Sequence, residues 1–410
     1  MVVRKKTLLQ KTFFIFCIVF IVAFLASSPA VLTISLVSFL ALAIYDGYLN
    51  KDFNAKWQNF ISNKSYVAAT SIFFIIAYSG IYSELTPFYW DRIRVALPFL
   101  ILPFAFSSLP KLSERQYQLV LYFLVIAVTL ASIGTLVNYL SDYAFYNKEL
   151  ESGRPIPTPI HHIRFSLLIA FTVAVGLWLF VKNIVYKYAW ERWLILSLTG
   201  FLFVFIHVLS VRSGIAVMYL TLFCLSLQYV FNTKRYVLGG SVVLMIMAAP
   251  FLAYQLVPSF KSRIAYAIYD FQNMQKGNVK NFSDGERLIS YEAGFQIGNR
   301  SPWLGVGIGD LDNEVHQFYA KKYPEFTVKR PHNQFIFFYA AIGIIGTIAF
   351  LIVFLIPFFY NYNFKDELIL AFYIIVFLSF MVETTIGSAI GTAYYIFFLL
   401  FLVKHKVLPS

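Results

Sequence analysis

A histidine and an asparagine, His332 and Asn333, lie where a basic, proline-bent segment meets a strongly apolar run. The apolar run extends from residue 334 to about residue 360, so the pair stands at the expected boundary between membrane and water. A histidine side chain has an unperturbed pKa of roughly 6.5, which lets it act as a base near neutral pH. The pair is a candidate for proton transfer, although an interfacial histidine beside a helix-capping asparagine would give the same pattern.

Arg212 is the most unusual cation of the chain. It lies in a short turn, residues 209–214, between two apolar runs, with almost no loop to hold it in water. A guanidinium suits phosphate because its planar fork donates two parallel hydrogen bonds. We therefore predict a fixed cation for a lipid-linked pyrophosphate. The alternative is a guanidinium that reaches out to an ordinary phospholipid phosphate.

Arg287 and Arg164 are two further cations on the same predicted side. Arg287 falls in the first turn of a loop helix that begins at the capping-box pattern of residues 283–286 and runs to about Gly298. The backbone N–H groups of a helix start favour an anion, so Arg287 would strengthen a phosphate site. Arg164 opens an apolar span just after His161 and His162. Ordinary solvated or interfacial charges remain the alternative for both arginines.

The elements that position these residues must lie in a membrane. Hydrophobic residues make up 59% of the 410 residues and charged residues 13%, whereas a soluble domain is about half apolar and about a quarter charged. The net charge of +13 is explained in part by basic cytoplasmic loops, and no nucleic-acid motif accompanies it, so no nucleic-acid partner is predicted. Both cysteines, Cys17 and Cys224, lie in apolar runs and indicate neither a disulfide nor a thiolate site.

Twelve apolar runs qualify as membrane spans, since a bilayer core needs about 20 apolar residues per helix and fewer for a short one. They cover residues 12–28, 30–45, 65–82, 92–106, 116–140, 161–181, 193–209, 213–231, 236–257, 333–360, 367–382 and 387–403. The first run resembles a signal peptide, but the second follows so closely that we predict an uncleaved helical hairpin. A cleaved signal peptide is the alternative.

The distribution of lysine and arginine gives the orientation. With the N-terminus in the cytoplasm, the inside segments hold seventeen basic residues and the short outside segments hold six. The remaining ten lie in the long outside loop. We predict cytoplasmic termini and three parts: nine helices in residues 1–257, an extracytoplasmic and partly helical loop in residues 258–331, and three helices in residues 332–410.

The glycine-rich segment 305–309 does not indicate a nucleotide site. It lacks the G-x-G-x-x-G spacing and the strand–turn–helix context of a dinucleotide fingerprint. We predict a turn that lets the backbone approach a ligand or a neighbouring helix. His161 and His162 likewise have no carboxylate or thiolate at ligand spacing, so neither a metal nor another cofactor is predicted.

Three motifs resemble those of the O-antigen ligase family. His332-Asn333, nine residues, Gly343, two residues and Gly346 is similar to the family signature His-(Asn/Ser/Gln)-x9-Gly-x-x-Gly. The turn around Arg212 is similar to the family's Ser-x-Arg-(Ser/Gly) turn. Arg287 followed by the Pro-x-x-Gly-Val-Gly run of residues 302–307 is similar to the family's Arg and Pro-x-x-Gly-x-Gly pattern. The layout of a dozen helices with a large loop after the ninth matches over nearly the whole chain.

The resemblance implies an all-α, GT-C-like integral membrane glycosyltransferase of the bacterial inner membrane, with its site on the periplasmic face. Its donor would be an undecaprenyl-pyrophosphate-linked glycan and its acceptor lipid A–core, with membrane lipids as its surroundings and with no metal. His332 would be the general base, and Arg212 and Arg287 would stabilise the leaving pyrophosphate. The residues expected to bind substrate are Arg164, His161, His162, Arg330 and Asn333.

The sequence leaves alternatives open for both the stereochemistry and the reaction class. One direct displacement would invert the anomeric centre, while the loop carboxylates Glu286, Asp310 and Asp312 leave a retaining route open. An O-antigen or capsular polymerase would use the same donor, and a protein O-glycosyltransferase is a weaker alternative. A lipid-oligosaccharide flippase or transporter is the non-enzymatic alternative, but the sequence has no related halves and its cations collect at the outer boundary.

Overall fold

The computed structural model describes residues 2–84, 86–185, 187–276 and 283–406, and every regular element in these ranges is a helix. The first part of the chain forms α1 (Val2–Leu25), α2 (Pro29–Asn50), α3 (Phe53–Ser62), α4 (Lys64–Tyr78), η1 (Ser79–Ile81), α5 (Pro87–Ser108), α6 (Glu114–Ser141), α7 (Tyr143–Glu151), α8 (His162–Val181), α9 (Glu191–Leu209), α10 (Arg212–Thr233) and α11 (Tyr236–Leu256). The second part forms α12 (Pro258–Gln275), α13 (Ser283–Gly298), α14 (Ile308–Lys322), α15 (Gln334–Phe359), η2 (Tyr360–Lys365), α16 (Glu367–Val382), η3 (Thr385–Gly387) and α17 (Ala389–His405).

Each of the twelve predicted spans overlaps one of these helices. Within the described ranges, nine helices are long and apolar enough to cross a membrane, namely α1, α2, α4 with η1, α6, α8, α9, α10, α11 and α15 with η2. Helices α16 and α17 are apolar but shorter, and α5 contains Pro98 and Pro103 and is outside that set. The chain is therefore an all-α integral membrane protein, and the number of crossings stays a prediction.

The core lies around α8 and α17. Most side chains of α8 are buried, and so is every side chain of α17 from Gly391 to Leu402. Helix α10 comes close to α8 at Gly214, where an added Cβ would lie 2.2 Å from Oγ of Ser166. Only a glycine fits at this position, which lets the start of α10 pack closely against the start of α8.

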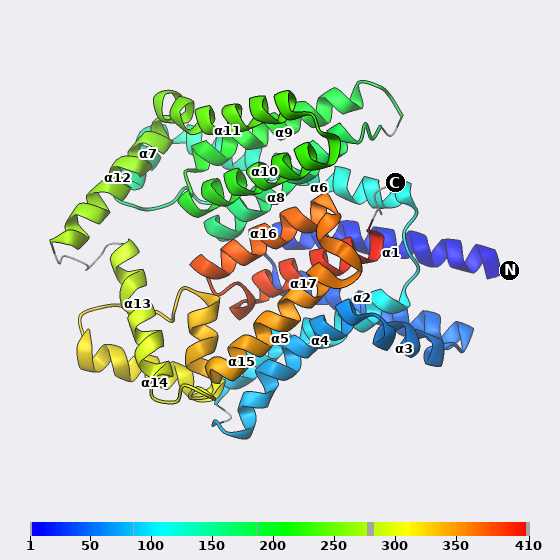
Figure 1. The fold of residues 1–410 in the computed structure, drawn as a ribbon, viewed down its shortest axis with the longest axis horizontal. Helices are drawn as coiled ribbons and strands as arrows, with labels where there is room; N and C mark the ends of the chain where they lie inside the picture. The colour runs from blue at the N-terminus through cyan, green and yellow to red at the C-terminus, as the bar shows by residue number, and fades with distance from the viewer. Residues whose placement is uncertain (1, 85, 186, 277–282, 407–410) are drawn as a thin grey trace.

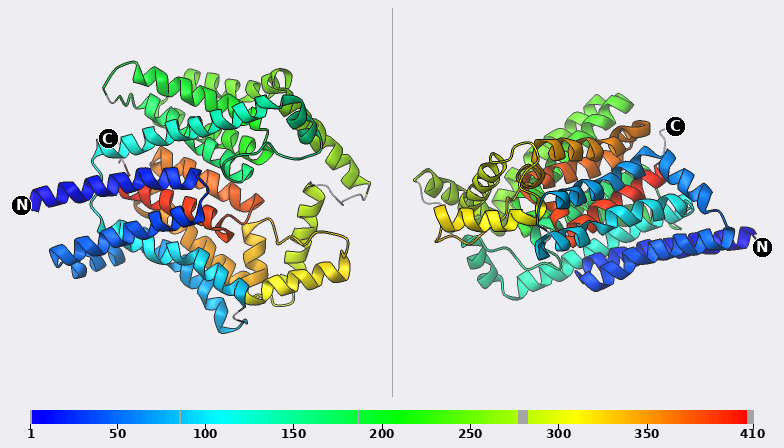
Figure 2. Two further views of the ribbon diagram at one scale, coloured as in Figure 1. Left: turned by 180° about the vertical axis from the view of Figure 1, so that it is seen from behind. Right: turned by 90° about the horizontal axis from the view of Figure 1, so that it is seen from below.

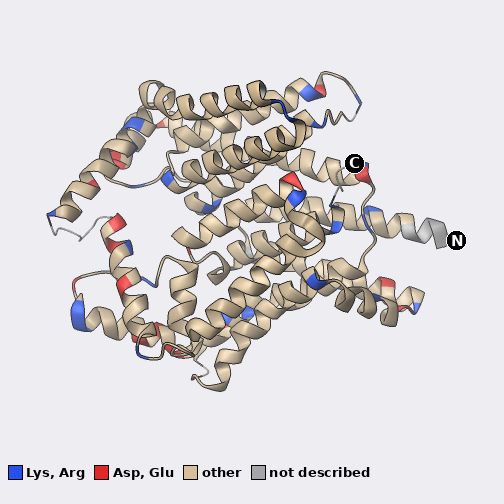
Figure 3. Ribbon diagram, viewed as in Figure 1, with Lys and Arg blue, Asp and Glu red and all other residues tan. Residues whose placement is uncertain are grey.

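The loop helices gather at one end of the bundle. In Figure 1, α12, α13 and α14 lie at the left, while α1 begins and α17 ends toward the right. The two further views in Figure 2 keep the yellow α14 and the start of α1 at opposite ends. We call the end with α12, α13 and α14 the loop end. Figure 3 shows charged residues mainly toward the two ends and few between them, as expected for a membrane protein.

Helix α15 is broken at Gly343, which the prediction of one continuous helix over residues 333–360 did not include. Gly343 has φ 64° and ψ −173°, outside the helical region. Figure 1 shows the short first segment at a wide angle to the rest of α15. A positive φ is strained for any residue with a Cβ, so the signature glycine supplies a bend rather than only a close packing surface.

The glycine-rich segment 302–307 fills this break. The N–H groups of Val306 and Gly307 donate to the carbonyls of Ala340 (3.0 Å) and Ala341 (2.8 Å). On the other side of the bend, the N–H of Ile344 donates to the carbonyl of Pro302 (2.8 Å). These bonds occupy backbone groups that the bend releases, which an apolar environment requires. The predicted close approach of segment 305–309 is confirmed, since Val306 and Gly307 bond to the backbone of a helix.

Candidate functional site

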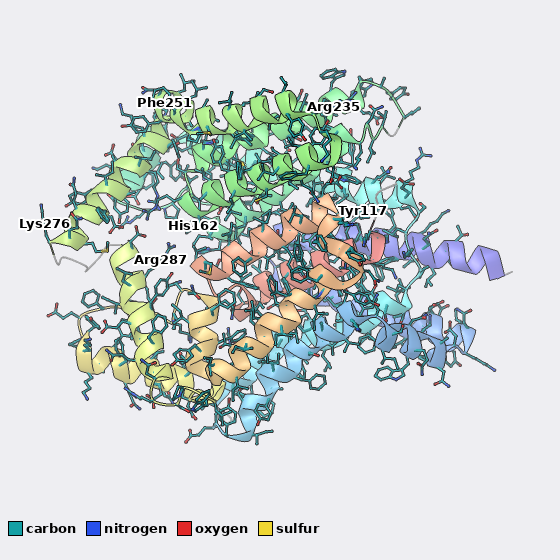
Figure 4. All side chains as sticks on the ribbon, in the orientation of Figure 1. Tyr117, His162, Arg235, Phe251, Lys276 and Arg287 are labelled. Carbon is teal, nitrogen blue, oxygen red and sulfur yellow. The ribbon has the colours of Figure 1, made fainter. Side chains whose placement is uncertain are left out.

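Most of the predicted site residues come together at the loop end. They stand at the start of α8, the start of α10, the first turns of α13 and the segment before α15. Figure 4 labels His162 and Arg287 at this end, while the labelled Tyr117 and Arg235 lie toward the opposite end. Four chain segments that are distant in sequence thus contribute to one charged region.

Arg212 is positioned by the tight turn between α9 and α10. Ser210 adopts a left-handed conformation (φ 57°), and its hydroxyl donates to the carbonyl of His207 (2.7 Å). Arg212 is the first residue of α10. Its two terminal nitrogens donate to the two carboxylate oxygens of Asp284, at 2.8 and 3.0 Å. Both side chains keep 35% of their surface exposed, so solvent reaches this ion pair.

Two more arginines adjoin the same carboxylate. A terminal nitrogen of Arg287 lies 3.9 Å from Asp284, one turn earlier on α13. Burial lowers the pKa of Arg263 on α12, and the nearby charges of Arg212 and Arg287 lower it further. The backbone N–H of Asp284 donates to the carboxylate of Asp270 (3.3 Å). The cluster therefore places three guanidinium groups beside two carboxylates, which is the charge pattern of an anion site with its own counter-ions.

His332 is held by α13 through its backbone. Its N–H donates to the hydroxyl of Ser290 (3.3 Å), and its carbonyl accepts from the hydroxyl of Tyr291 (3.3 Å). Burial, together with the charges of Arg287 and Lys329, lowers the pKa of His332 to about 4. The imidazole is therefore neutral at pH 7 and has a nitrogen free of charge that can accept a proton.

Asn333 caps the helix that follows His332. Its side-chain oxygen accepts from the N–H groups of Phe335 (2.9 Å) and Ile336 (3.1 Å). Its side-chain nitrogen donates to the carbonyl of Met381 near the end of α16 (3.1 Å). The amide thus ties the segment with His332 to α16, and its predicted contact with substrate stays a prediction.

Arg164 pairs with a carboxylate that the sequence analysis did not single out. It forms an ion pair with Glu383, which ends α16, and both side chains are largely buried. Among the described residues, the second carboxylate oxygen of Glu383 is buried without a hydrogen-bond partner. Glu383 stands in a short link between two apolar helices, as Arg212 does. The same rule for charges at the membrane boundary would have identified it.

His161 and His162 lie beside this pair and beside the arginine cluster. Their ring centroids are 4.3 Å apart, with an angle of 37° between the planes. Glu383 is close enough to His161 for an electrostatic interaction. Arg263 and Arg287 are likewise close enough to interact electrostatically with His162. The paired histidines therefore connect the Arg164–Glu383 pair to the cationic cluster.

Arg330 makes its contacts elsewhere. Its guanidinium donates to the carboxylate of Asp312 on α14 (2.8 Å) and lies over the ring of Phe88 on α5, 4.4 Å from the centroid. These contacts attach the segment before His332 to α14 and α5. Its predicted role in substrate binding stays a prediction.

The architecture and the site together define a class. The chain is a multi-pass, all-α membrane protein whose loop end gathers arginines, paired histidines and a neutral histidine. A family model described as O-Antigen ligase matches residues 197–351, a stretch that includes Arg212, Arg287 and His332. This match supports the assignment of the chain to the O-antigen ligase family, whose members are glycosyltransferase-like ligases and polymerases. The comparison with curated proteins gives no match.

Proposed function

We propose that this protein is an O-antigen ligase. It transfers a finished O-antigen glycan from undecaprenyl pyrophosphate to lipid A–core during lipopolysaccharide synthesis. The observation that carries this proposal is the convergence of Arg212, Arg287 and a neutral His332 from α10, α13 and the segment before α15. Cations for a pyrophosphate and a base for a hydroxyl are the two requirements of such a transfer.

The arginines stabilise the leaving group. The bond between the anomeric carbon and the bridging oxygen breaks, and the oxygen stays with the lipid pyrophosphate, which gains negative charge. Arg212 and Arg287 face a shared anion position, since both approach the carboxylate of Asp284. Fixed donors aimed at developing charge lower the barrier without reorganisation, so this role needs no divalent ion.

His332 acts as the general base. A hydroxyl of the acceptor sugar attacks the anomeric carbon, and its proton passes to the uncharged imidazole as the new carbon–oxygen bond forms. Such a proton transfer contributes about 10²- to 10⁴-fold in rate. One displacement inverts the anomeric centre. Glu286 accepts a hydrogen bond from Lys329, and it is close enough to His332 for its charge to raise the pKa of that imidazole. A retaining route through this carboxylate is therefore the alternative to test.

The remaining polar residues hold the substrates and the base. Arg164 and His161 lie beside Glu383, whose carboxylate has one oxygen without a partner among the described residues. We assign these three residues, with His162, Arg330 and Asn333, to substrate binding and to the positioning of His332. The protein lies in the bacterial inner membrane with cytoplasmic termini and a periplasmic loop over residues 258–331, between nine helices in residues 1–257 and three in residues 332–410.

The test is reconstitution of the purified protein in proteoliposomes with an undecaprenyl-pyrophosphate glycan. One reaction contains rough lipopolysaccharide, and a second contains only a carrier-linked glycan as acceptor. We expect transfer to lipopolysaccharide in the presence of EDTA. Extension of the carrier-linked glycan without transfer to lipopolysaccharide would identify a polymerase instead, which is the other activity found in the family. A requirement for a restored divalent ion would contradict the metal-independent mechanism.

A further inference from the structure

The carboxylate of Asp284 occupies the edge of Arg212 that a phosphate would use. It accepts from both terminal nitrogens of that guanidinium, at 2.8 and 3.0 Å, and lies 3.9 Å from Arg287. Two parallel bonds from one guanidinium are the arrangement preferred by carboxylate and phosphate alike. A pyrophosphate that binds Arg212 in this way must displace the carboxylate.

From this relationship we infer that Asp284 is an internal counter-ion that competes with the lipid pyrophosphate for Arg212 and thereby promotes release of the product. The inference rests on the proposed function, because it concerns the site that holds the donor's pyrophosphate. Asp284 is a positioning residue in this role: it acts through Arg212 and does not touch the reacting carbon.

The chemistry of the reaction gives such a competitor a purpose. In the donor, each phosphate has one ester bond and one anhydride bond and carries one negative charge. After transfer, the outer phosphate of the carrier is a terminal group joined only through the anhydride oxygen and carries additional negative charge, so a purely cationic site would hold the product more tightly than the substrate. Tight binding of the product slows turnover. A carboxylate that returns to Arg212 offsets this difference.

The position of Asp284 allows the exchange. Its side chain and that of Arg212 are each 35% exposed, so an anion can approach the pair from solvent. The backbone N–H of Asp284 is bonded to Asp270, which keeps the first turn of α13 in place while the side chain changes its torsion angles. Arg287 shares the carboxylate at a longer distance, so the second cation can turn toward the incoming anion.

A structural role for the pair predicts the opposite effect. If Asp284 only orients Arg212 for the substrate, removal of the carboxylate releases the guanidinium and weakens the binding of anions. If Asp284 competes, removal of its charge strengthens the binding. The sign of the change in affinity therefore separates the two roles.

The experiment measures binding of inorganic pyrophosphate to the full-length protein in nanodiscs by calorimetry. We expect Asp284→Asn to bind pyrophosphate about tenfold more tightly than the original protein, because the carboxylate that competes for Arg212 has lost its charge. Asp284→Ala must shift the affinity in the same direction, and Asp284→Glu must stay near the original affinity. The matched control is Glu314→Gln, which removes a carboxylate paired with the exposed Arg300 on the same loop.

A second arm tests whether Arg212 is the shared partner. In an Arg212→Ala background, Asp284→Asn should no longer tighten binding, because the guanidinium for which Asp284 and pyrophosphate compete is absent. In turnover assays, Asp284→Asn should show a burst of one product per enzyme and stronger inhibition by undecaprenyl pyrophosphate.

Four outcomes overturn the inference. Affinity that is unchanged or weaker in Asp284→Asn makes the carboxylate a structural partner. Equal tightening in Glu314→Gln makes the effect one of overall charge, and tightening that survives Arg212→Ala places the competition at another cation. In these three cases the original protein still binds pyrophosphate, so the proposed function stands. If neither the original protein nor Asp284→Asn binds pyrophosphate, the anion site of the proposed function fails as well.

Discussion

The guanidinium of Arg164, in the first turn of α8, forms an ion pair with the carboxylate of Glu383 in the link from α16 to α17. This pair joins two core helices at the loop end and brings a carboxylate next to His161. Because both partners are largely buried, neither tolerates the loss of the other well.

Glu383→Gln is expected to destabilise the protein by about 2 kcal/mol or more, since it leaves a largely buried guanidinium without its counter-charge. The check is thermal unfolding of the detergent-solubilised protein. The double variant Arg164→Gln with Glu383→Gln should recover part of the loss, because no charge is then left alone. If the double variant is as unstable as the sum of the two single ones, the pair has no energetic coupling.

Arg212→Ala and Arg287→Ala should each reduce glycan transfer by at least about 10²-fold, as expected for removal of a fixed charge that faces the leaving group. The protein should still accumulate in membranes, since both side chains are partly exposed. Arg300→Ala is the matched control, because Arg300 is more exposed and pairs only with Glu314 in the described bonds. Transfer that is equally low in all three variants would indicate a general effect of charge.

His332→Ala should slow transfer by about 10²-fold or more while binding of the donor is largely kept. The pH dependence has a definite sign. Burial and nearby cations lower the pKa of His332 to about 4, so kcat/KM should fall only as the pH approaches that value. A bound pyrophosphate adds negative charge and favours the imidazolium, so the corresponding pKa in kcat should lie higher. An acid limb that persists in His332→Ala would assign the base to another residue.

Gly343→Ala should prevent normal accumulation of the protein. Gly343 has φ 64°, and a Cβ there would lie 2.3 Å from backbone atoms of Trp303, which cannot move aside as a side chain would. Gly200→Ala in α9 is the control, since a Cβ at that position meets no atom within 4 Å. Folded yield can be compared by size-exclusion chromatography. Normal yield of Gly343→Ala would show that the bend is not required.

Reporter fusions test the orientation of the chain. A fusion after Arg235 should report the cytoplasm, and a fusion after Lys276 should report the periplasm, because the predicted ninth span separates them. Both sites lie near the ends of helices, at α11 and α12. The same side for both fusions would remove one span from the twelve and would invert the orientation downstream.

The sequence was sufficient for features that depend on local composition. The twelve apolar runs all correspond to helices because length and hydropathy determine a membrane helix, and the loop helix α13 ends at Gly298 as predicted. Arg212 could be selected because a charge between two spans is costly. Glu383 meets the same criterion, but the site predicted from the sequence does not include it.

Other features depend on contacts between distant residues. The pairing of Arg212 with Asp284, which are 72 residues apart, follows from how α10 and α13 meet and leaves no local pattern. The bend at Gly343 was hidden inside a continuous apolar run, and its bonds come from segment 302–307. The glycine-rich segment 305–309 was predicted to let the backbone approach a ligand or a neighbouring helix, but periodicity could not identify the partner.

The bonds across the bend also decide which parts of the site are joined to one another. Segment 334–342 is attached to residues 302–307 by its carbonyls, and His332 is attached to α13 by both of its backbone groups. His332 and Arg287 are therefore both attached to α13, whereas Arg212 stands at the start of α10 and reaches α13 through its side-chain pair with Asp284. The separation of Arg287 from His332 thus depends on α13 and its bonds, whereas the separation of Arg287 from Arg212 depends on how α10 and α13 meet.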